Sequence, residues 1–410
     1  MPSDKPVHQP LAHPSNPPSD ASSDASSDQL CNQLSDQHLD QAFNQGLRNL
    51  SAAERCEQYF GANDLIGCLD VMSARNRSYK NQHSDIFPYT AKGSFDPPLP
   101  TLDEIIMARE GSDMIDIMNQ TVWRVGQYIV KTGVDAEIYV EAENLLYLEQ
   151  NSTVRAPKLY AAFTSQEMDP LQLNTPGTPK KVYYYLIMEL IEGEELGKID
   201  KSKLEVGVIR KLWRLLGEQL CQLRSVKPED PKHFGRIHGR PYALMPLLYH
   251  APAPDFTNYG PFTYEQLVQR LICSSMTGAA LGRYPDDYGT LQRLSYDYAE
   301  YVMLKLAGPN DRLPVLSHLD LQAHNIIVKL ARDKNGEPYD VEEVTMVDFF
   351  SLCWMPPWYE AGNMCMFTFS PDSDHQRLGH IALEKMGNVN LVIAAFLGVS
   401  AHYDAFHFFH

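Results

Sequence analysis

One segment restricts the possible folds of this chain more than any other. It reads His318-Leu-Asp320-Leu-Gln-Ala-His-Asn325. It is followed by an apolar strand, a Gly-containing turn and a second apolar strand that leads to Asp348. The two strands predict a hairpin whose rim brings Asn325 and Asp348 to one spot. Carboxylate and amide oxygens are the ligands that a hard cation such as Mg2+ prefers. The segment therefore predicts a magnesium site, with Asp320 beside it and free to take the proton of a hydroxyl group.

A second group of polar residues lies upstream, among short strands. Two strands joined by a Gly-Gln turn predict a hairpin that ends with Lys131, and the helix predicted over residues 137–150 carries Glu141 on its apolar face. A lysine at this position can reach the α and β phosphates of ATP, and an ion pair with a glutamate would hold it there. Mg2+ at Asn325 and Asp348 would then neutralise the phosphoryl group that leaves ATP.

The strand predicted over residues 182–191 supplies the remaining part of a nucleotide site. It is apolar and ends in a short polar segment that stops at Gly193. An extended backbone at this place can hydrogen-bond an adenine. We therefore expect Met188, Glu189 and Ile191 to bind the nucleotide.

The order of the predicted elements indicates two lobes. Strands, one helix and further strands precede Gly193, and long amphipathic helices such as 206–223 and 291–306 follow it. The fold class predicted is α+β and bilobal, with a small antiparallel β-sheet and one helix in the N-terminal lobe and a larger, mainly helical C-terminal lobe. Three domains are predicted. Residues 1–38 form a disordered acidic Ser/Pro-rich tail, and residues 39–192 form a nucleotide-binding lobe. Residues 193–410 form a helical lobe with the catalytic loop and the substrate site.

Charge and hydropathy exclude several kinds of partner. The chain has 35 Lys and Arg against 52 Asp and Glu, a net charge of −17, whereas binding to nucleic acid requires clustered basic residues. The longest apolar run, over residues 391–399, is far shorter than the roughly 20 residues of a membrane span. The N-terminus lacks the pattern of a signal or transit peptide. We therefore expect a cytoplasmic protein that binds neither nucleic acid nor membranes and acts on a neutral or cationic small molecule.

Taken in order, these motifs resemble the aminoglycoside phosphotransferase-like family, the small-molecule branch of the protein-kinase-like fold, and especially its fungal members. The matching segments read IVK, EAENLLYL, APKLY, LIMELIEGEEL, SHLDLQAHNIIV and VDFFSLCWMPPWYE, within about residues 121–358. The resemblance implies a kinase that transfers the γ-phosphoryl group of MgATP to a small-molecule alcohol. It implies Asp320 and Lys131 as catalytic residues. Because Asp320 already has the role of the base, we expect His318 to be a structural hydrogen-bonding residue of the catalytic loop.

The chain departs from protein kinases at three points. Leu319 stands where protein kinases have arginine, Phe350 replaces the glycine of Asp-Phe-Gly, and no Ala-Pro-Glu segment follows. These differences favour a small-molecule kinase over a protein kinase. The segment 116–120 also lacks the glycines of a phosphate-binding loop, which motivates the alternative of a catalytically inactive pseudokinase or nucleotide-binding interaction module. Residues 233–262 are expected to help select the acceptor, which the sequence does not name.

Several of these residues also have a purely structural interpretation. Lys131 is compatible with a solvated strand end, and Asp348 with a cap of the hairpin. Large aromatic residues usually serve burial, so Trp354, Trp358 and Tyr359 are expected to pack in the core rather than to form a substrate platform.

Overall fold

The computed structural model describes most of the chain that follows the N-terminal segment. The described residues are 46, 50–62, 64, 66–68, 70–71, 86–110, 122–134, 138–167, 181–242, 260–281, 296–368, 379–387 and 389–402. Four parts of the sequence prediction lie outside these ranges. They are the tail over residues 1–38, the segment 116–120, residues 243–259 of the expected acceptor segment, and the start of the helix predicted over residues 291–306.

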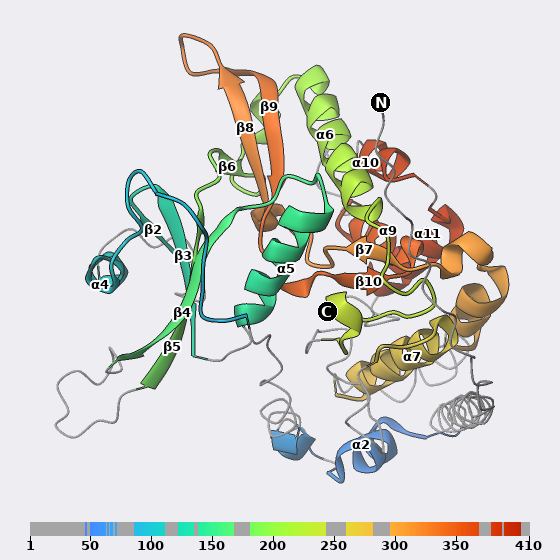
Figure 1. The fold of residues 1–410 in the computed structure, drawn as a ribbon. Helices are drawn as coiled ribbons and strands as arrows, with labels where there is room; N and C mark the ends of the chain where they lie inside the picture. Colours follow the sequence, from blue (N-terminus) through green and yellow to red (C-terminus); the bar gives the residue numbers. More distant parts are fainter. Residues whose placement is uncertain are drawn as a thin grey trace, which may run out of the picture.

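Five antiparallel strands form the sheet of the N-terminal lobe. They are β1 (Tyr89–Thr90), β2 (Val122–Val125), β3 (Tyr128–Gly133), β4 (Leu159–Glu167) and β5 (Lys181–Glu189), in the order β1-β4-β5-β3-β2 across the sheet. Figure 1 labels β2 to β5. The predicted hairpin and the two later strands are confirmed. The two-residue strand β1 has no pattern in the sequence that predicts it, and β5 ends at Glu189 rather than at Ile191.

Two helices accompany this sheet. Helix α4 (Leu102–Glu110) packs on β2 and begins with the predicted capping box, because the Thr101 hydroxyl accepts a hydrogen bond from the Glu104 backbone and the Glu104 carboxylate accepts one from the Thr101 backbone. Helix α5 (Ile138–Asn151) lies between the sheet and the larger lobe (Figure 1).

Helix α5 is buried on more than one face. The predicted apolar face with Leu145 and Leu148 packs in the core, but Glu143 and Tyr147, on another face, are buried as well. The Glu143 carboxylate contacts Arg236 at 3.0 Å and Arg240 at 2.8 Å, so residues of the larger lobe cover the face that a simple amphipathic pattern leaves to solvent.

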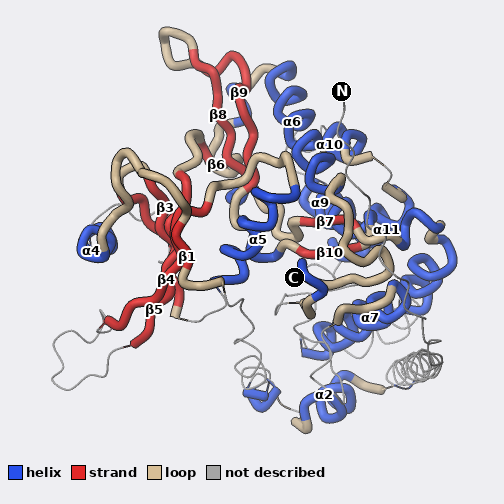
Figure 2. The backbone as a smooth tube through the Cα atoms, viewed as in Figure 1, coloured by secondary structure: helices blue, strands red, loops and turns tan. Residues whose placement is uncertain are grey.

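The larger lobe is mainly helical and carries two small sheets, drawn in red in Figure 2. Strands β6 (Glu194–Glu195), β8 (Ile326–Arg332) and β9 (Pro338–Met346) form one sheet in the order β6-β8-β9, and β7 (Val315–Ser317) pairs with β10 (Cys353–Met355) in the other. The helices are α6 (Val206–Arg224), α7 (Tyr264–Leu281), a π-helical turn (Val302–Leu306), α9 (Pro357–Thr368), α10 (His380–Lys385) and α11 (Leu391–His402). The predicted α+β, two-lobed fold class is confirmed.

Helix α6 contributes the apolar stripe that the sequence predicts. Its residues Ile209, Leu212, Leu216, Leu220 and Leu223 are all buried. Gly217 on this helix permits close packing, because a Cβ atom there would lie 2.8 Å from Ala382 of α10. Trp354, Trp358 and Tyr359 are also buried, as expected.

Helix α2 (Ala52–Phe60) packs against α7 of the helical lobe and buries Cys56 and Phe60 there. The predicted domain boundary at residue 39 assigns this helix to the nucleotide-binding lobe, whereas its contacts lie with the helices of the larger lobe. Among the described helices, none has the length and apolar character that spanning a membrane requires.

Candidate active site

Lys131 lies at the centre of the site, with a carboxylate from each lobe in contact with its ammonium group. It occupies β3, where it pairs with Leu186 of β5, and its Nζ atom lies 2.7 Å from Glu141 Oε2 and 2.8 Å from Asp348 Oδ1. Burial disfavours the charged lysine, but the two carboxylates outweigh this effect and raise the pKa of Lys131 above its ordinary value. The ammonium group therefore stays charged between the lobes.

The two carboxylates respond differently to burial. Burial raises the pKa of Glu141 to about 6, and the charge of Lys131 opposes this shift only in part. For Asp348 burial also disfavours the charge, but Lys131 prevails and lowers the pKa of Asp348 below its ordinary value. Asp348 is thus the carboxylate that stays ionised across the neutral range.

The backbone at Asp348 adopts a left-handed conformation, with φ of 62° and ψ of 64°, directly before the 3-10 turn over Phe349–Ser351. Aspartate tolerates this conformation better than most residues. Asn144 of α5 holds the turn, because its amide nitrogen donates hydrogen bonds to the carbonyl oxygens of Phe349 at 2.7 Å and Phe350 at 3.2 Å.

Asn144 is a residue that sequence reasoning missed. It lies one turn after Glu141, its side chain is completely buried, and its amide oxygen has no hydrogen-bond partner. A buried amide costs free energy unless it is hydrogen-bonded, so an asparagine at a buried helix position is a signal of a specific role. Helix α5 therefore contacts the Asp348 region twice, through the Glu141–Lys131 pair and through Asn144.

The loop before β8 brings Asp320 and Asn325 together. The Asn325 amide nitrogen donates to Asp320 Oδ2 at 3.0 Å and to the Asp320 carbonyl at 2.8 Å, and Gln322 Nε2 donates to Asp320 Oδ1 at 2.9 Å. The backbone amide of Val347 donates to the Asn325 carbonyl at 2.9 Å, which places Asn325 beside the chain that leads into Asp348. The structure thus places the side chains of Asp320 and Asn325 in contact and places Asn325 next to the residue that precedes Asp348.

His318 uses both ring nitrogens to hold this loop. Its Nδ1 atom accepts from the Asp320 backbone amide at 3.3 Å, so Nε2 carries the proton and donates to the Val347 carbonyl at 2.9 Å. The ring is completely buried and lies 4.8 Å from the ring of Phe349. These contacts agree with a structural hydrogen-bonding residue.

Glu360 of α9 is a second residue that sequence reasoning missed. Its Oε2 atom accepts from the backbone amides of His318 at 2.6 Å and Leu319 at 3.1 Å, and burial raises the pKa of this carboxyl. Leu319 has a φ of 67°, which is strained for a leucine. Asn363 Nδ2 also donates to the Leu319 carbonyl at 2.9 Å, so two α9 side chains stabilise the strained loop beside Asp320.

The three residues expected to bind the nucleotide base lie at and after the end of β5. Met188 is buried and pairs with Ile129 of β3, whereas Ile191 is half-buried. The carboxylate of Glu189 contacts the guanidinium group of Arg155, and its backbone amide donates to the Lys158 carbonyl at 2.9 Å, so the backbone carbonyl is the part of Glu189 that remains for a base.

The oxygen atoms at the two predicted metal ligands suit Mg2+. Because the Asn325 amide nitrogen donates to Asp320, its amide oxygen is the atom left for a cation, and Asp348 adds an ionised carboxylate. Over the part of the chain that the structure describes, no group of three or more His, Cys, Asp and Glu side chains is arranged to hold a metal. Asn325 and Asp348 would supply two oxygen ligands, and Mg2+ generally takes one or two carboxylates from a protein and completes its coordination with water and phosphate oxygens.

The antiparallel sheet carries a lysine–glutamate pair, and the helical lobe carries an Asp-x4-Asn loop and an aspartate after a hairpin. This arrangement belongs to the two-lobed, kinase-like class of folds. Residues 116–387 match the model of the phosphotransferase enzyme family, and the chain belongs to this family. The resemblance that the motifs carry is thereby confirmed. A search of curated proteins found no match to the chain.

Solved structures of aminoglycoside phosphotransferases are similar to this chain at low sequence identity. A crystal structure of APH(4)-Ia is 11% identical and covers 73% of this chain and 87% of that chain, with a TM-score of 0.43. A ternary complex of a thermostable APH(4)-Ia mutant with AMP-PNP and hygromycin B is 12% identical over 68% and 79%, with a TM-score of 0.42. A gentamicin complex of APH(2")-IIa is 16% identical over 67% and 75%, with a TM-score of 0.37.

Proposed function

We propose that the protein transfers the γ-phosphoryl group of MgATP to a hydroxyl group of a small molecule. The observation that carries the proposal is the position of Lys131 Nζ, 2.7 Å from Glu141 and 2.8 Å from Asp348. The ammonium group of this lysine, which belongs to the sheet, contacts both its paired glutamate and an aspartate from the helical lobe. These contacts lie beside the loop with Asp320.

Each residue has a distinct role in this proposal. Lys131 binds the α and β phosphates, and Glu141 holds its ammonium group in place. Asn325 and Asp348 would hold Mg2+, which supplies charge neutralisation for the transferred phosphoryl group. Asp320 orients the acceptor hydroxyl and takes its proton.

The two lobes divide the substrates in this proposal. Residues 39–192 bind ATP, with the base near Met188 and the backbone of Glu189 and Ile191, and residues 193–410 carry the catalytic loop and the acceptor site. Helix α2 is an exception, because it packs on α7 and therefore belongs with the acceptor lobe. The net charge of −17 favours a neutral or cationic acceptor.

An ATP-consumption screen tests the proposal. Purified protein with MgATP is offered aminoglycosides, choline-like amines, sugars and secondary-metabolite alcohols, and each product is examined by mass spectrometry for an added phosphoryl group. The Asp320→Asn variant is the control for transfer by a contaminating kinase. Binding of MgATP without transfer to any alcohol would favour the alternative of a nucleotide-binding interaction module.

A further inference from the structure

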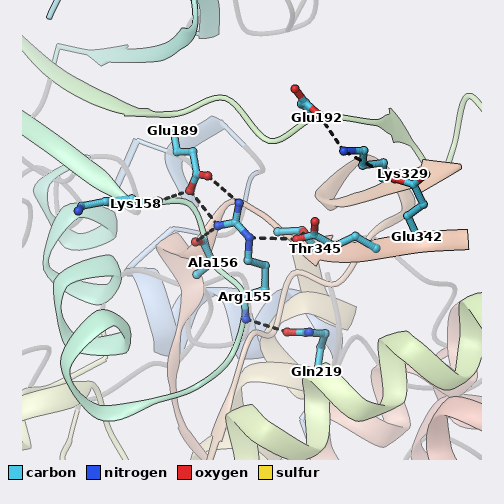
Figure 3. Close-up of polar contacts among 10 residues, drawn as sticks. Arg155, Ala156, Lys158, Glu189, Glu192, Gln219, Lys329, Glu342 and Thr345 are labelled. Carbon is cyan, nitrogen blue, oxygen red and sulfur yellow. Dashed lines mark hydrogen bonds and ion pairs between the residues drawn. The ribbon is translucent and has the colours of Figure 1, made fainter. Parts of the chain in front are cut away.

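Arg155, in the loop between α5 and β4, joins the end of β5 to the larger lobe (Figure 3). Its guanidinium group donates two hydrogen bonds to the Glu189 carboxylate, from Nη1 to Oε2 at 2.8 Å and from Nη2 to Oε1 at 2.6 Å. Its Nε atom donates to Glu343 Oε1 of β9 at 3.0 Å. One side chain thus bridges the last residue of β5 and the hairpin β8–β9.

The surrounding residues fix the orientation of this bridge. The Arg155 backbone amide donates to Gln219 Oε1 of α6 at 2.8 Å, and Thr345 Oγ1 donates to the same Glu343 oxygen at 3.0 Å. The Glu189 carboxylate also accepts from the Lys158 backbone amide at 3.2 Å. Both carboxylates that bind the guanidinium group are therefore held by a second contact.

A second cross-link joins the segment after β5 to the same hairpin. Lys329 of β8 contacts Glu192 at 2.9 Å and Glu342 of β9 at 3.7 Å (Figure 3). Strand β6, which begins at Glu194, pairs with β8 through its backbone. A Cβ atom on Gly193 would lie 2.6 Å from the Val328 carbonyl, so the two backbones approach closely.

The hairpin that receives these contacts also carries the proposed metal ligands. Asn325 directly precedes β8, and Asp348 follows β9 after one intervening residue. Fixing residues 189–193 against this hairpin therefore fixes the proposed base-binding backbone relative to the proposed magnesium site.

We infer that Arg155 is a positioning residue that sets the place of the nucleotide base relative to the metal-bound phosphates. The inference rests on the proposed function, because it assigns the base to residues 189–191. The contacts of Arg155 described above do not include Lys131, Asn325 or Asp348, the residues proposed to bind the phosphates and the metal. Arg155 therefore acts through Glu189. Arginine suits this role, since its planar group binds one carboxylate with two parallel hydrogen bonds and a second carboxylate from Nε.

The bridge differs from an ordinary surface ion pair in its geometry. Exposed pairs contribute little because solvent screens them, but here the two carboxylates come from different elements and the geometry is bidentate. Burial disfavours the charge of Glu189, yet Arg155 prevails and lowers the pKa of this carboxyl. The pair is thus charged throughout the neutral range.

The test compares two ligands that differ in the base. The dissociation constants of MgATP and of magnesium tripolyphosphate, which has no base, are measured by calorimetry for the full chain and for Arg155→Ala and Arg155→Lys. We expect Arg155→Ala to weaken MgATP binding about tenfold and tripolyphosphate binding less than twofold, with Arg155→Lys in between. Equal weakening of both ligands, or no weakening of MgATP, would overturn the inference.

Two controls separate this role from general destabilisation. Arg214→Ala removes a comparable arginine–carboxylate pair, with Glu218 on α6, that does not touch β5, and it should leave both dissociation constants unchanged. Glu189→Gln should weaken MgATP binding, and the double variant with Arg155→Ala should be no weaker than Arg155→Ala alone. Additive effects of the two substitutions would contradict action through Glu189. A wild-type protein that binds neither ligand would instead contradict the proposed function.

Discussion

The ammonium nitrogen of Lys131 lies 2.8 Å from Asp348 Oδ1, although the two residues are 217 positions apart in the sequence. This contact joins the sheet of the N-terminal lobe to the hairpin of the helical lobe. It also explains why the half-buried Asp348 remains ionised, since a neighbouring positive charge favours a carboxylate. The proposed magnesium ligand is thus charged before a cation arrives.

Replacing Asp348 should remove the response of the protein to magnesium. At a ligand concentration about 100-fold above the dissociation constant, MgATP should stabilise the wild type by about 2.7 kcal/mol, and Asp348→Ala should lose most of this stabilisation. Thermal unfolding with ATP, with and without Mg2+, measures the effect. Asp340→Ala is the matched control, because Asp340 lies on β9 of the same hairpin and pairs with Lys211. Equal stabilisation of Asp348→Ala and wild type would show that the metal assignment is wrong.

The buried Glu141 carboxyl should give the stability a specific pH dependence. Because the pKa of Glu141 is raised from 4.5 to about 6, the folded protein binds this proton more tightly than the unfolded chain. Its contribution to the free energy of unfolding is therefore full below pH 4.5 and is lost as the pH rises to about 6. Asp348, whose pKa is lowered from 3.8, contributes with the opposite sign and loses its contribution as the pH falls below that value.

Urea unfolding across this pH range measures the contribution of Glu141. The free energy of unfolding of the wild type should fall, relative to that of Glu141→Gln, between pH 4.5 and about 6. The slopes are compared rather than the absolute values, because the substitution also weakens the pair with Lys131. Parallel pH profiles of the two proteins would contradict a raised pKa at this position.

Asn144→Leu should weaken the response of the protein to magnesium with little change in its stability. The substitution keeps the size of the side chain and removes a buried amide oxygen without a partner, but it also removes the donor to Phe349 and Phe350. We expect the Mg2+ concentration for half-maximal stabilisation by ATP to rise about tenfold, equivalent to about 1.4 kcal/mol, while the free energy of unfolding changes by about 1 kcal/mol or less.

Asn151→Leu is the matched control for this substitution. Asn151 lies at the end of the same helix and donates to Tyr147 within it, so its loss should not change the magnesium response. A similar magnesium response in both variants would show that Asn144 does not position Asp348.

Local patterns in the sequence were sufficient to predict the strands β3 and β5, the stripe of α6 and the positions of Lys131 and Asp320. These features depend on periodicity or on short motifs, which nearby residues determine. Asn144 and Glu360 could not be predicted in the same way. Each is one of several polar residues in its helix. Only contacts with distant loops decide which of these residues is buried and which backbone groups it binds.

The same reasoning explains the remaining differences. Glu143 is buried because Arg236 and Arg240 of the larger lobe cover its face of α5, and no pattern within the helix contains this information. The bridge between Arg155 and Glu189 likewise joins segments whose proximity follows from the packing of the two lobes. The strands β7 and β10, of three residues each, are too short for an alternating pattern to be recognised.

Gly193→Ala should destabilise the protein by more than backbone strain alone. Gly193 has a φ of 139°, and an added Cβ atom would lie 2.6 Å from the Val328 carbonyl. Gly126→Ala is the control, since Gly126 also has a positive φ, of 62°, but open space around it. We expect a loss of about 1 kcal/mol for Gly126→Ala from strain and of roughly 2 to 3 kcal/mol for Gly193→Ala, measured by urea unfolding. An equal or smaller loss for Gly193→Ala would contradict the close approach of β8.

The proposed transfer reaction depends most directly on Asp320. In phosphoryl transfer this carboxylate orients the acceptor hydroxyl and accepts its proton, whereas nucleotide affinity depends on Lys131 and the metal ligands. Asp320→Asn keeps the size of the side chain but is a far poorer proton acceptor at neutral pH. Lys131→Ala, in contrast, should weaken both nucleotide binding and transfer.

The decisive measurement is the rate of phosphoryl transfer by Asp320→Asn in a single turnover, together with its dissociation constant for MgATP. The proposed function predicts that the rate falls by about 10² or more, the usual scale for loss of a general base, while the dissociation constant stays within about twofold of the wild-type value. Transfer by Asp320→Asn at the wild-type rate would contradict the proposed mechanism. A wild-type protein that phosphorylates no alcohol would contradict the proposed enzyme itself.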